Sequence, residues 1–250
     1  MRTEIVTRLR EAGCVFAEDE AELLMSAART PEELGEMVSR RVTGLPIEQI
    51  VGWADFCGLR IAVEPGVFVP RRRTEFLVER AVALVRPGDV AVDLCCGAGA
   101  IAAALCAAVP GLEAYAADID PVAVRCARRN VPGQVYEGDL YDPLPESLRG
   151  RVAVLTANVP YVPTGEIALL PAEARTHEPL AALDGGTDGL EILRRVARGA
   201  PDWLAPGGHL LIETSERQAA LAVEAFAGLD ARIARSAELG AVVVIGRAGR

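Results

Sequence analysis

A glycine-rich segment near the middle of the chain has the residue types that bind an anionic cofactor. Gly97, Gly99 and Ala102 fit the pattern G-x-G-x-x-[G/A] between a β-prone run and an apolar helical run. Backbone N–H groups in such a turn can face an anionic group at the start of the helix. Asp118 ends the next β-prone run, nineteen residues after Gly99, and its carboxylate can accept hydrogen bonds from both hydroxyls of a ribose. The spacing suits either a dinucleotide or S-adenosylmethionine.

Two more polar residues follow later β-prone runs. Asp139 can accept a hydrogen bond from an adenine amine, although a loop aspartate is more often a turn or cap residue. Asn158 opens the segment Asn158-Val159-Pro160-Tyr161. Its side-chain oxygen and a neighbouring backbone carbonyl offer two acceptors to a substrate NH₂ group, and Tyr161 can wall the pocket against water. A plain strand-ending turn would use the same residue types without any ligand.

A sheet of alternating strands and helices would bring these residues together. From residue 74 onward the sequence predicts a parallel, doubly wound sheet with helices on both faces. The expected helices are 74–85, 100–109, 121–130, 189–204 and 215–229, and the expected strands are 89–95, 112–119, 133–139, 151–160, 208–214, 231–236 and 241–246. The last two strands are joined by a short loop, which predicts an antiparallel edge.

The first part of the chain has a different character. Residues 1–40 have apolar residues at three- and four-residue intervals, and Thr30-Pro31-Glu32-Glu33 is a typical helix start. Glycines and prolines then separate short β-prone runs as far as residue 70, which predicts a hairpin-like linker. We therefore expect a helical domain over 1–45, a linker over 46–70 and a cofactor-binding domain over 71–250.

The composition is that of a globular protein with a substantial core. The chain has 250 residues, of which 51% are hydrophobic and 24% charged, and this excludes disorder. Its longest apolar run, 100–109, has ten residues, against the ~20 that a membrane-spanning helix needs. The first residues contain no apolar leader segment. Six cysteines without a CxxC pair predict a reducing, cytoplasmic environment.

Charge and metal-binding residue types argue against two kinds of site. The formal net charge is −9, which does not suit the broad phosphate-binding face of a nucleic-acid-binding protein. All 26 basic residues are arginine. With only His177 and His209 and no paired cysteine spacing, we expect no metal site.

The ordered series of motifs between about Arg40 and Gln218 resembles the HemK/PrmC family of protein-(glutamine-N5) methyltransferases. The family has eight segments with a counterpart here. They are IPRPETE (69–75), DLGTGSG (93–99), GD (138–139), NPPY (158–161), EP-x-x-AL-x-GG-x-DGL (178–190), PGG (206–208), IE (212–213) and Gln (218). A glycine loop alone is a weak signal, whereas this ordered series is specific.

The resemblance implies a fold, a cofactor and a set of site residues. The fold is the Rossmann-like class I methyltransferase fold, with a seven-stranded, mostly parallel sheet and an antiparallel edge. The cofactor is S-adenosyl-L-methionine (SAM). The residues expected to bind it are Asp93, Cys95, Cys96, Gly97, Ala98, Gly99, Asp118, Ile119, Asp139, Leu140 and Asn158. The residues expected at the catalytic position are Asn158, Val159, Pro160 and Tyr161.

The resemblance also implies a methyl acceptor, the amide nitrogen of a glutamine in a protein loop. Peptide-chain release factors carry such a glutamine in a Gly-Gly-Gln loop, and the N-terminal helices would contact that partner. The sulfonium of SAM is an activated methyl donor, so no nucleophilic residue or metal is needed. Two acceptors that hold both N–H bonds would aim the nitrogen at the methyl group.

Three departures from the family pattern indicate a divergent paralogue. Cys95-Cys96 replace Gly-Thr, Val159 replaces the first proline of NPPY, and Arg72-Arg73 replace Pro-Glu. Pro160 still restrains the residue before it to extended conformations, and the adjacent cysteines are more often packing residues than a redox or metal pair. These departures therefore concern the substrate more than the cofactor.

Four alternatives remain open at this point. A SAM-dependent methyltransferase acting on a small molecule or peptide in a biosynthetic pathway fits the altered segments near the pocket. A nucleic-acid adenine methyltransferase shares the Asn-Pro-Tyr logic but should carry a basic face. An NAD-dependent dehydrogenase fits the glycine spacing but gives no reason for the segments at 158–161 and 178–190. A non-catalytic binding paralogue would result if the cysteine pair blocks the cofactor.

Overall fold

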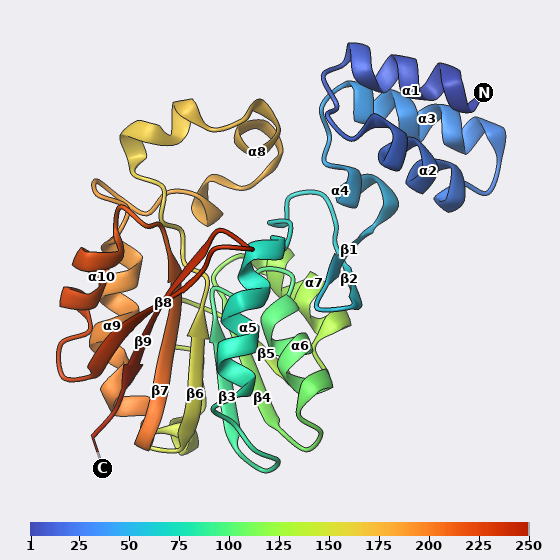
Figure 1. The fold of residues 1–250 in the computed structure, drawn as a ribbon. Coiled ribbons are helices and arrows are strands. Elements are labelled where there is room, and N and C mark those ends of the chain that lie inside the picture. The colour runs from blue at the N-terminus through green and yellow to red at the C-terminus, as the bar shows by residue number, and fades with distance from the viewer. Residues whose placement is uncertain (250) are drawn as a thin grey trace.

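The computed structural model describes residues 1–249 and combines a group of N-terminal helices with an α/β sheet domain (Figure 1). The N-terminal helices are α1 (Arg2–Glu11), α2 (Ala17–Ala27), α3 (Pro31–Val42) and α4 (Ile47–Val51). The helical prediction for residues 1–40 is confirmed. Thr30 caps α3, because its side chain accepts a hydrogen bond from the Glu33 backbone N–H while Pro31 occupies the first turn. Ile5, Leu9 and Leu24 lie in the apolar core that these helices share.

A two-stranded hairpin follows the helices, as the glycine and proline spacing predicted. Strands β1 (Trp53–Phe56) and β2 (Leu59–Ala62) pair antiparallel. Asn130, at the end of helix α7 (Pro121–Asn130), fixes the hairpin on the sheet domain. Its Oδ1 accepts from the Ala62 N–H at 2.8 Å and its Nδ2 donates to the Ala62 carbonyl at 2.9 Å.

Seven strands form the main sheet in the order β5-β4-β3-β6-β7-β9-β8. They are β3 (Val90–Leu94), β4 (Glu113–Asp118), β5 (Gln134–Glu137), β6 (Val152–Ala157), β7 (Leu204–Thr214), β8 (Asp230–Ser236) and β9 (Ala241–Arg247). The first five are parallel, and β9 pairs antiparallel with both β7 and β8. The sheet therefore has the predicted arrangement, seven mostly parallel strands with an antiparallel edge, which is the one expected for the class I methyltransferase fold.

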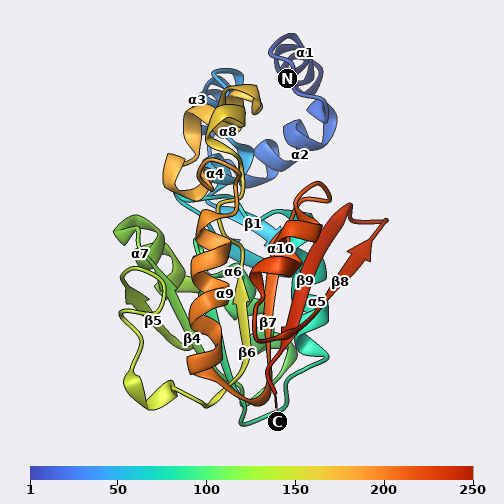
Figure 2. The same cartoon turned by 90° about the vertical axis from the view of Figure 1, so that its left-hand side faces the viewer.

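Helices cover both faces of the sheet (Figures 1 and 2). The remaining helices are η1 (Arg72–Thr74), α5 (Glu75–Val82), α6 (Ala100–Ala108), η2 (Glu146–Leu148), η3 (Thr164–Leu169), α8 (Ala172–His177), η4 (Leu180–Ala182), α9 (Glu191–Trp203) and α10 (Ala219–Ala225). On β7 the side chains alternate between two cores. Leu211 packs in the core that includes α5 and α6, while Leu210 and Ile212 pack in the core that includes α9.

The helix expected over 215–229 is shorter, because its first residues have another role. Residues 215–218 form a turn closed by the Gln218 N–H on the Ser215 carbonyl, and α10 starts after it. Gln218 Nε2 donates to the Tyr161 and Asp188 carbonyls at 2.9 and 3.0 Å. The tertiary contacts of Gln218 therefore prevail over local helix propensity.

The long connection between β6 and α9 carries α8 and reaches the N-terminal helices (Figure 2). Arg41 joins the two parts. Its guanidinium pairs with Glu20 of α2 at 2.6 Å and with Glu173 of α8 at 2.8 Å. The side chains of Arg41 and Glu20 are only 10% and 13% exposed. Among residues 1–249 no helix is long and apolar enough to cross a membrane.

Replacing Arg41 should destabilise the N-terminal helices locally. Arg41→Ala leaves the nearly buried Glu20 carboxylate without its partner, at a cost of about 3 kcal/mol. We expect faster amide hydrogen exchange across α1–α3 and unchanged exchange in β3 and β6. Arg40→Ala, at the exposed neighbouring position, is the matched control. Equal protection in the two variants would contradict a stabilising role for the Arg41 ion pairs.

Candidate functional site

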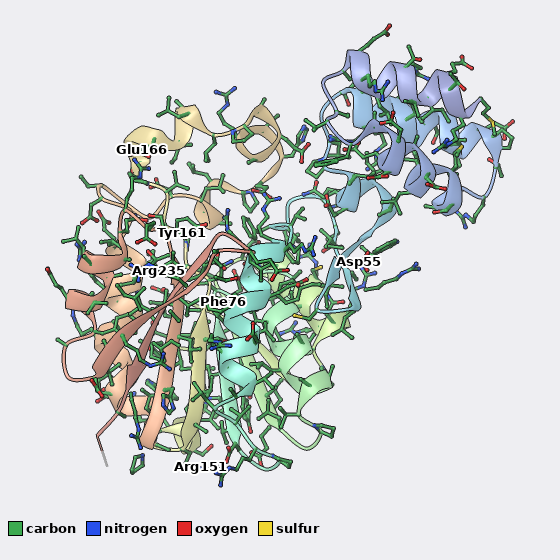
Figure 3. All side chains as sticks on the ribbon, in the orientation of Figure 1. Asp55, Phe76, Arg151, Tyr161, Glu166 and Arg235 are labelled. Atoms are coloured by element: carbon green, nitrogen blue, oxygen red, sulfur yellow. The ribbon has the colours of Figure 1, made fainter. Side chains whose placement is uncertain are left out.

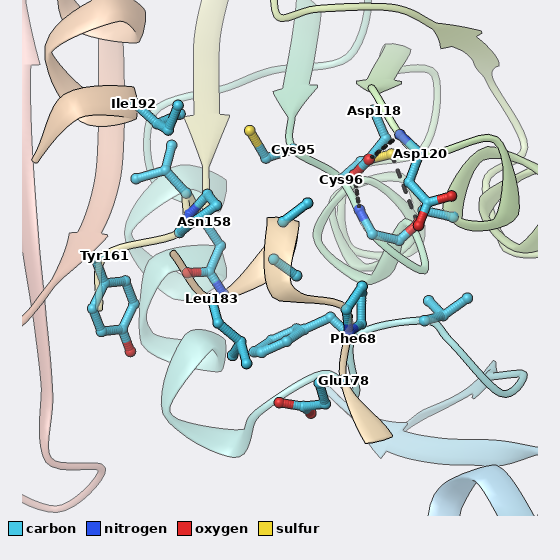
Figure 4. A pocket seen from close by; sticks show the side chains of 18 of the residues that line it. Phe68, Cys95, Cys96, Asp118, Asp120, Asn158, Tyr161, Glu178, Leu183 and Ile192 are labelled. Carbon is cyan, nitrogen blue, oxygen red and sulfur yellow. Dashed lines mark hydrogen bonds between the residues drawn. The ribbon is translucent and has the colours of Figure 1, made fainter. Parts of the chain in front are cut away.

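A cavity of about 1070 Å³ opens at the carboxyl ends of the central strands, beneath the connection that carries α8. Twelve of the residues selected from the sequence line it. They are Cys95, Cys96, Gly97, Ala98, Asp118, Ile119, Asp139, Leu140, Asn158, Val159, Pro160 and Tyr161. Figure 4 shows Asp118 and Asn158 in the same pocket, with the cysteine loop between them. The remaining two, Asp93 and Gly99, are not among the lining residues.

Asp118 connects two loops at one end of the cavity. It ends β4, and its Oδ2 accepts from the Gly97 N–H at 2.8 Å while Oδ1 accepts from the Asp120 N–H at 2.9 Å (Figure 4). Burial raises the pKa of Asp118, and these backbone donors oppose that shift. Each carboxylate oxygen has a second lone pair. The side chain can therefore hold the loops and still accept ligand hydroxyls.

Asp93 lies beneath the glycine loop rather than in the cavity. Its side chain on β3 is buried, and Oδ1 accepts from the Thr156 hydroxyl of β6 at 2.9 Å. Its Oδ2 is buried and makes no hydrogen bond within residues 1–249. Burial raises the pKa of Asp93 to about 7, although the Thr156 bond lowers it. The carboxyl group thus joins β3 to the neighbouring strand β6.

The two glycines of the loop, Gly97 and Gly99, are favoured for different structural reasons. Gly99 has φ +76°, and a Cβ there would lie 2.5 Å from Val131 Cγ2. Glycine is therefore needed at this position for close packing against the end of α7. Gly97 has φ +54°, and its Cβ position faces open space. The backbone at Gly97 is consequently open to a ligand.

The adjacent cysteines differ in environment. Cys95 lines the cavity with φ +53°, in the left-handed region that favours glycine. Cys96 is buried in a cluster with Ala102, Ala116 and Val124. Burial raises the pKa of both thiols, so neither is a thiolate nucleophile at neutral pH. Within the described part of the chain, residues 1–249, no group of three or more His, Cys, Asp or Glu side chains could hold a metal ion.

Asp139 stands at the same edge of the sheet as Asp118. It follows β5, and its Oδ2 pairs with Arg195 Nη2 of α9 at 2.6 Å. Arg195 and Ile192 line the cavity from α9. The second carboxylate oxygen of Asp139 makes no hydrogen bond within residues 1–249 and can accept from a ligand amine.

The other end of the cavity is built around Asn158. It directly follows β6, and its Nδ2 lies 3.5 Å from the Thr74 hydroxyl of η1. Its Oδ1 makes no hydrogen bond in the part of the chain that the structure describes, so it can accept from a ligand. Val159 is buried. Figure 3 shows Tyr161 at the carboxyl end of β6, below the connection that carries Glu166.

Several residues at this end were not selected from the sequence. Arg71 pairs with the buried Glu178, and Arg73 pairs with the buried Glu213 at 2.9 Å and donates to the Tyr161 hydroxyl. These residues lie in the motif segments 69–75, 178–190 and 212–213. Membership of those segments was the signal in the sequence that could have identified them. Local spacing could not assign these side chains a role, because their partners lie more than 80 residues away in the sequence.

The buried Asp93 predicts a pH-dependent stability. Its pKa is raised from 3.8 to about 7, so the folded state keeps a proton that the unfolded state releases. Stability is unaffected by this group below about pH 4, falls as the pH rises to about 7, and then levels off. Urea unfolding of wild type and Asp93→Asn at pH 5 and pH 8 should show a larger loss of stability in the wild type than in the variant, because the other buried carboxyl groups are common to both. A parallel pH dependence in both proteins would contradict it.

Comparison with known proteins agrees with this arrangement. Residues 58–165 match the family described as methyltransferase small domain. The release factor glutamine methyltransferase of Geobacter sulfurreducens is 36% identical over 234 residues, covering 84% of this chain and 81% of that protein. The 4-amino-L-phenylalanine/4-methylamino-L-phenylalanine methyltransferase of Streptomyces pristinaespiralis is 40% identical over 204 residues, covering 78% and 69%.

A solved structure supports the fold independently. The crystal structure of a methyltransferase from Pyrococcus furiosus has a TM-score of 0.58 at 18% identity, covering 77% of this chain and 90% of that one. The curated relatives are similar at much higher identity and over most of both chains. The chain therefore belongs to the HemK/PrmC family of SAM-dependent protein-(glutamine-N5) methyltransferases.

Proposed function

We propose that this protein transfers a methyl group from SAM to the side-chain amide nitrogen of a glutamine in a protein. The observation that carries the proposal is the position of Asn158, which lies in one cavity with the glycine loop and Asp118. A cofactor bound at the loop and an amide bound at Asn158 would meet within that cavity. The names of the curated relatives support glutamine as the acceptor.

The residues at the loop end fit SAM. Asp118 would accept from the ribose hydroxyls, and Asp139 from the adenine amine. The open space at the Gly97 Cβ position leaves room for the methionine part beside the loop. Ile119 and Leu140 would line the adenine site, and Ile119 is exposed enough to be covered by it. When bound, SAM supplies an electrophilic methyl group on its sulfonium.

The residues at the other end fit a primary amide. The amide nitrogen is a poor nucleophile because its lone pair is delocalised, so its orientation matters. Asn158 Oδ1 would accept one N–H, and a backbone carbonyl of the same segment would accept the other. Both contacts favour the positive charge that develops on nitrogen, and the extra proton of the methylated nitrogen then leaves to water. Tyr161 and the buried Val159 would exclude water.

The N-terminal helices belong to this proposal as the part that recognises the protein partner. We place that role in the helical domain over 1–45, with the hairpin region as linker to the catalytic domain. The Arg41–Glu173 ion pair supports it, because it ties these helices to the connection above the cavity. The partner would present a Gly-Gly-Gln loop like that of a release factor.

A small amine is the second candidate acceptor, and one relative's name favours it. The Streptomyces pristinaespiralis protein is named for methylating an amino acid that carries an aromatic amine. The same two acceptors at Asn158 could hold such an NH₂ group.

The deciding experiment offers both acceptors to the purified protein with methyl-labelled SAM. One is a Gly-Gly-Gln peptide, with the matching Gly-Gly-Asn peptide as control, and the other is 4-amino-L-phenylalanine. We expect label on the glutamine side-chain nitrogen, located by mass spectrometry, and little on the control peptide. Methylation of the amino acid without methylation of the peptide would replace the proposal with the second candidate.

Asp118→Asn should weaken binding of S-adenosylhomocysteine. One oxygen that accepts from the ribose and the loop becomes a donor, and the loss should be on the order of 1–3 kcal/mol. Isothermal titration measures it directly. Asp142→Asn, at an exposed position nearby, is the control. Equal affinities of the two variants would remove Asp118 from the cofactor site.

Asn158→Ala should lower methyl transfer and leave cofactor affinity nearly unchanged. The amide loses its orienting acceptor, which should reduce the single-turnover rate by roughly 10²-fold. Val159→Pro restores the family residue and should keep the rate within about threefold, if only the backbone carbonyl acts there. A normal rate in Asn158→Ala refutes the role, whereas a large loss of cofactor binding would move Asn158 to the cofactor site.

A further inference from the structure

Tyr161 is positioned by hydrogen bonds to its backbone carbonyl and to its side-chain hydroxyl. Its backbone carbonyl accepts from Gln218 Nε2 at 2.9 Å, and its hydroxyl oxygen is contacted by Arg73 Nη2. The Arg73 guanidinium carbon also lies 5.8 Å from the centre of the Tyr161 ring. Both side chains line the cavity, and Figure 4 shows Tyr161 near Asn158. The ring and its hydroxyl therefore have a defined place beside the expected acceptor.

The direction of the Arg73–Tyr161 hydrogen bond follows from the chemistry of the groups. A guanidinium has five N–H donors and no acceptor, so the phenolic oxygen must accept. The hydroxyl makes no other hydrogen bond within residues 1–249. Burial and, after it, the charge of Glu213 raise the pKa of Tyr161, but Glu213 Oε1 is engaged by Arg73 and its Oε2 makes no hydrogen bond within residues 1–249. The phenolic proton is left for a ligand.

Arg73 is fixed in this orientation by a buried charge. Its Nε donates to Glu213 Oε1 at 2.9 Å; the Glu213 side chain is only 2% exposed, whereas the Arg73 side chain is 45% exposed. Turning the guanidinium away would leave that carboxylate buried without its cation, which is strongly unfavourable. Burial raises the pKa of Tyr161 to about 12 even though Arg73 lowers it. The phenol therefore retains its proton at neutral pH.

Resting on the proposed function, we propose that the Tyr161 hydroxyl donates a hydrogen bond to a carbonyl oxygen of the acceptor peptide. Arg73 is the positioning residue that keeps the hydroxyl proton free for this bond. A backbone carbonyl is the suitable acceptor, because donation to the glutamine's own amide oxygen would withdraw electrons from the reacting nitrogen. A carboxylate at position 73, as in the family's IPRPETE segment, would instead accept the phenolic proton itself.

Two substitutions of Arg73 distinguish its role as a hydrogen-bond donor from the space that its side chain fills. Arg73→Lys keeps only donors, whereas Arg73→Gln offers an amide oxygen that can take the Tyr161 proton. The tyrosine Fermi doublet in Raman spectra distinguishes a phenol that accepts from one that donates. Subtracting the spectrum of Tyr161→Phe isolates the doublet of Tyr161. In wild type and Arg73→Lys this doublet should indicate that the Tyr161 hydroxyl accepts a hydrogen bond. In Arg73→Gln it should indicate that the hydroxyl donates one. Identical spectra in the two Arg73 variants would overturn the role of Arg73.

Steady-state kinetics with the Gly-Gly-Gln peptide test the bond to the acceptor. Tyr161→Phe and Arg73→Gln should each raise the peptide KM roughly tenfold, the effect of one lost hydrogen bond, with kcat within about threefold. Because Arg73→Gln also leaves the buried Glu213 without its cation, its kinetics are measured at a temperature where circular dichroism shows the variant folded. The double variant should be no worse than either single one, because both lose the same bond. Arg73→Lys should rescue KM, and Arg72→Gln, at the exposed neighbouring position, is the control.

The outcomes separate this inference from the proposed function. An unchanged peptide KM in Tyr161→Phe overturns the inference while methylation of the peptide still supports the function. A wild-type protein that methylates no glutamine peptide overturns the function and the proposed bond to the peptide together. The Raman comparison would then still show whether Arg73 keeps the phenol an acceptor.

Discussion

The carboxylate of Asp118 is the contact on which the arrangement of the cavity depends. One side chain at the end of β4 accepts from the backbone of the glycine loop and from the loop that starts α7. Two loops from different βα units are thereby set at fixed positions above neighbouring strands. The ligand-facing geometry is thus a product of backbone hydrogen bonds, which depend little on the side chains of the loop. The loop therefore keeps its contact with Asp118 although Cys95 adopts a left-handed backbone conformation.

Much of the fold was predictable because its signals are local. Strand and helix periods, the capped start of α3 and the glycine loop each lie within a short stretch of sequence. The parallel order of the strands then follows from their alternation with helices. The cavity residues at the strand ends were predictable for the same reason, since carboxyl ends of parallel strands meet at one edge.

The rest could not be predicted, because it depends on contacts between distant segments. Asp93 was predicted as a cofactor-binding residue, and the contact that the structure shows for its side chain is with Thr156 on the neighbouring strand, 63 residues away. Gly99 fits the ligand motif, whereas the contact that requires glycine there is with Val131. Gln218 looked like part of a helix and instead holds the Tyr161 carbonyl. Only the folded chain brings these pairs together.

The ion pairs around the cavity share one chemical property. Arg41, Arg71, Arg73 and Arg195 each bind a carboxylate, and the chain has no lysine. A guanidinium does not release its proton in the range where proteins stay folded. Alkaline conditions therefore leave the cationic half of every such pair intact, and only acidification can discharge these contacts, through their carboxylates. The ion pairs around the site should therefore persist at alkaline pH and weaken only at acidic pH.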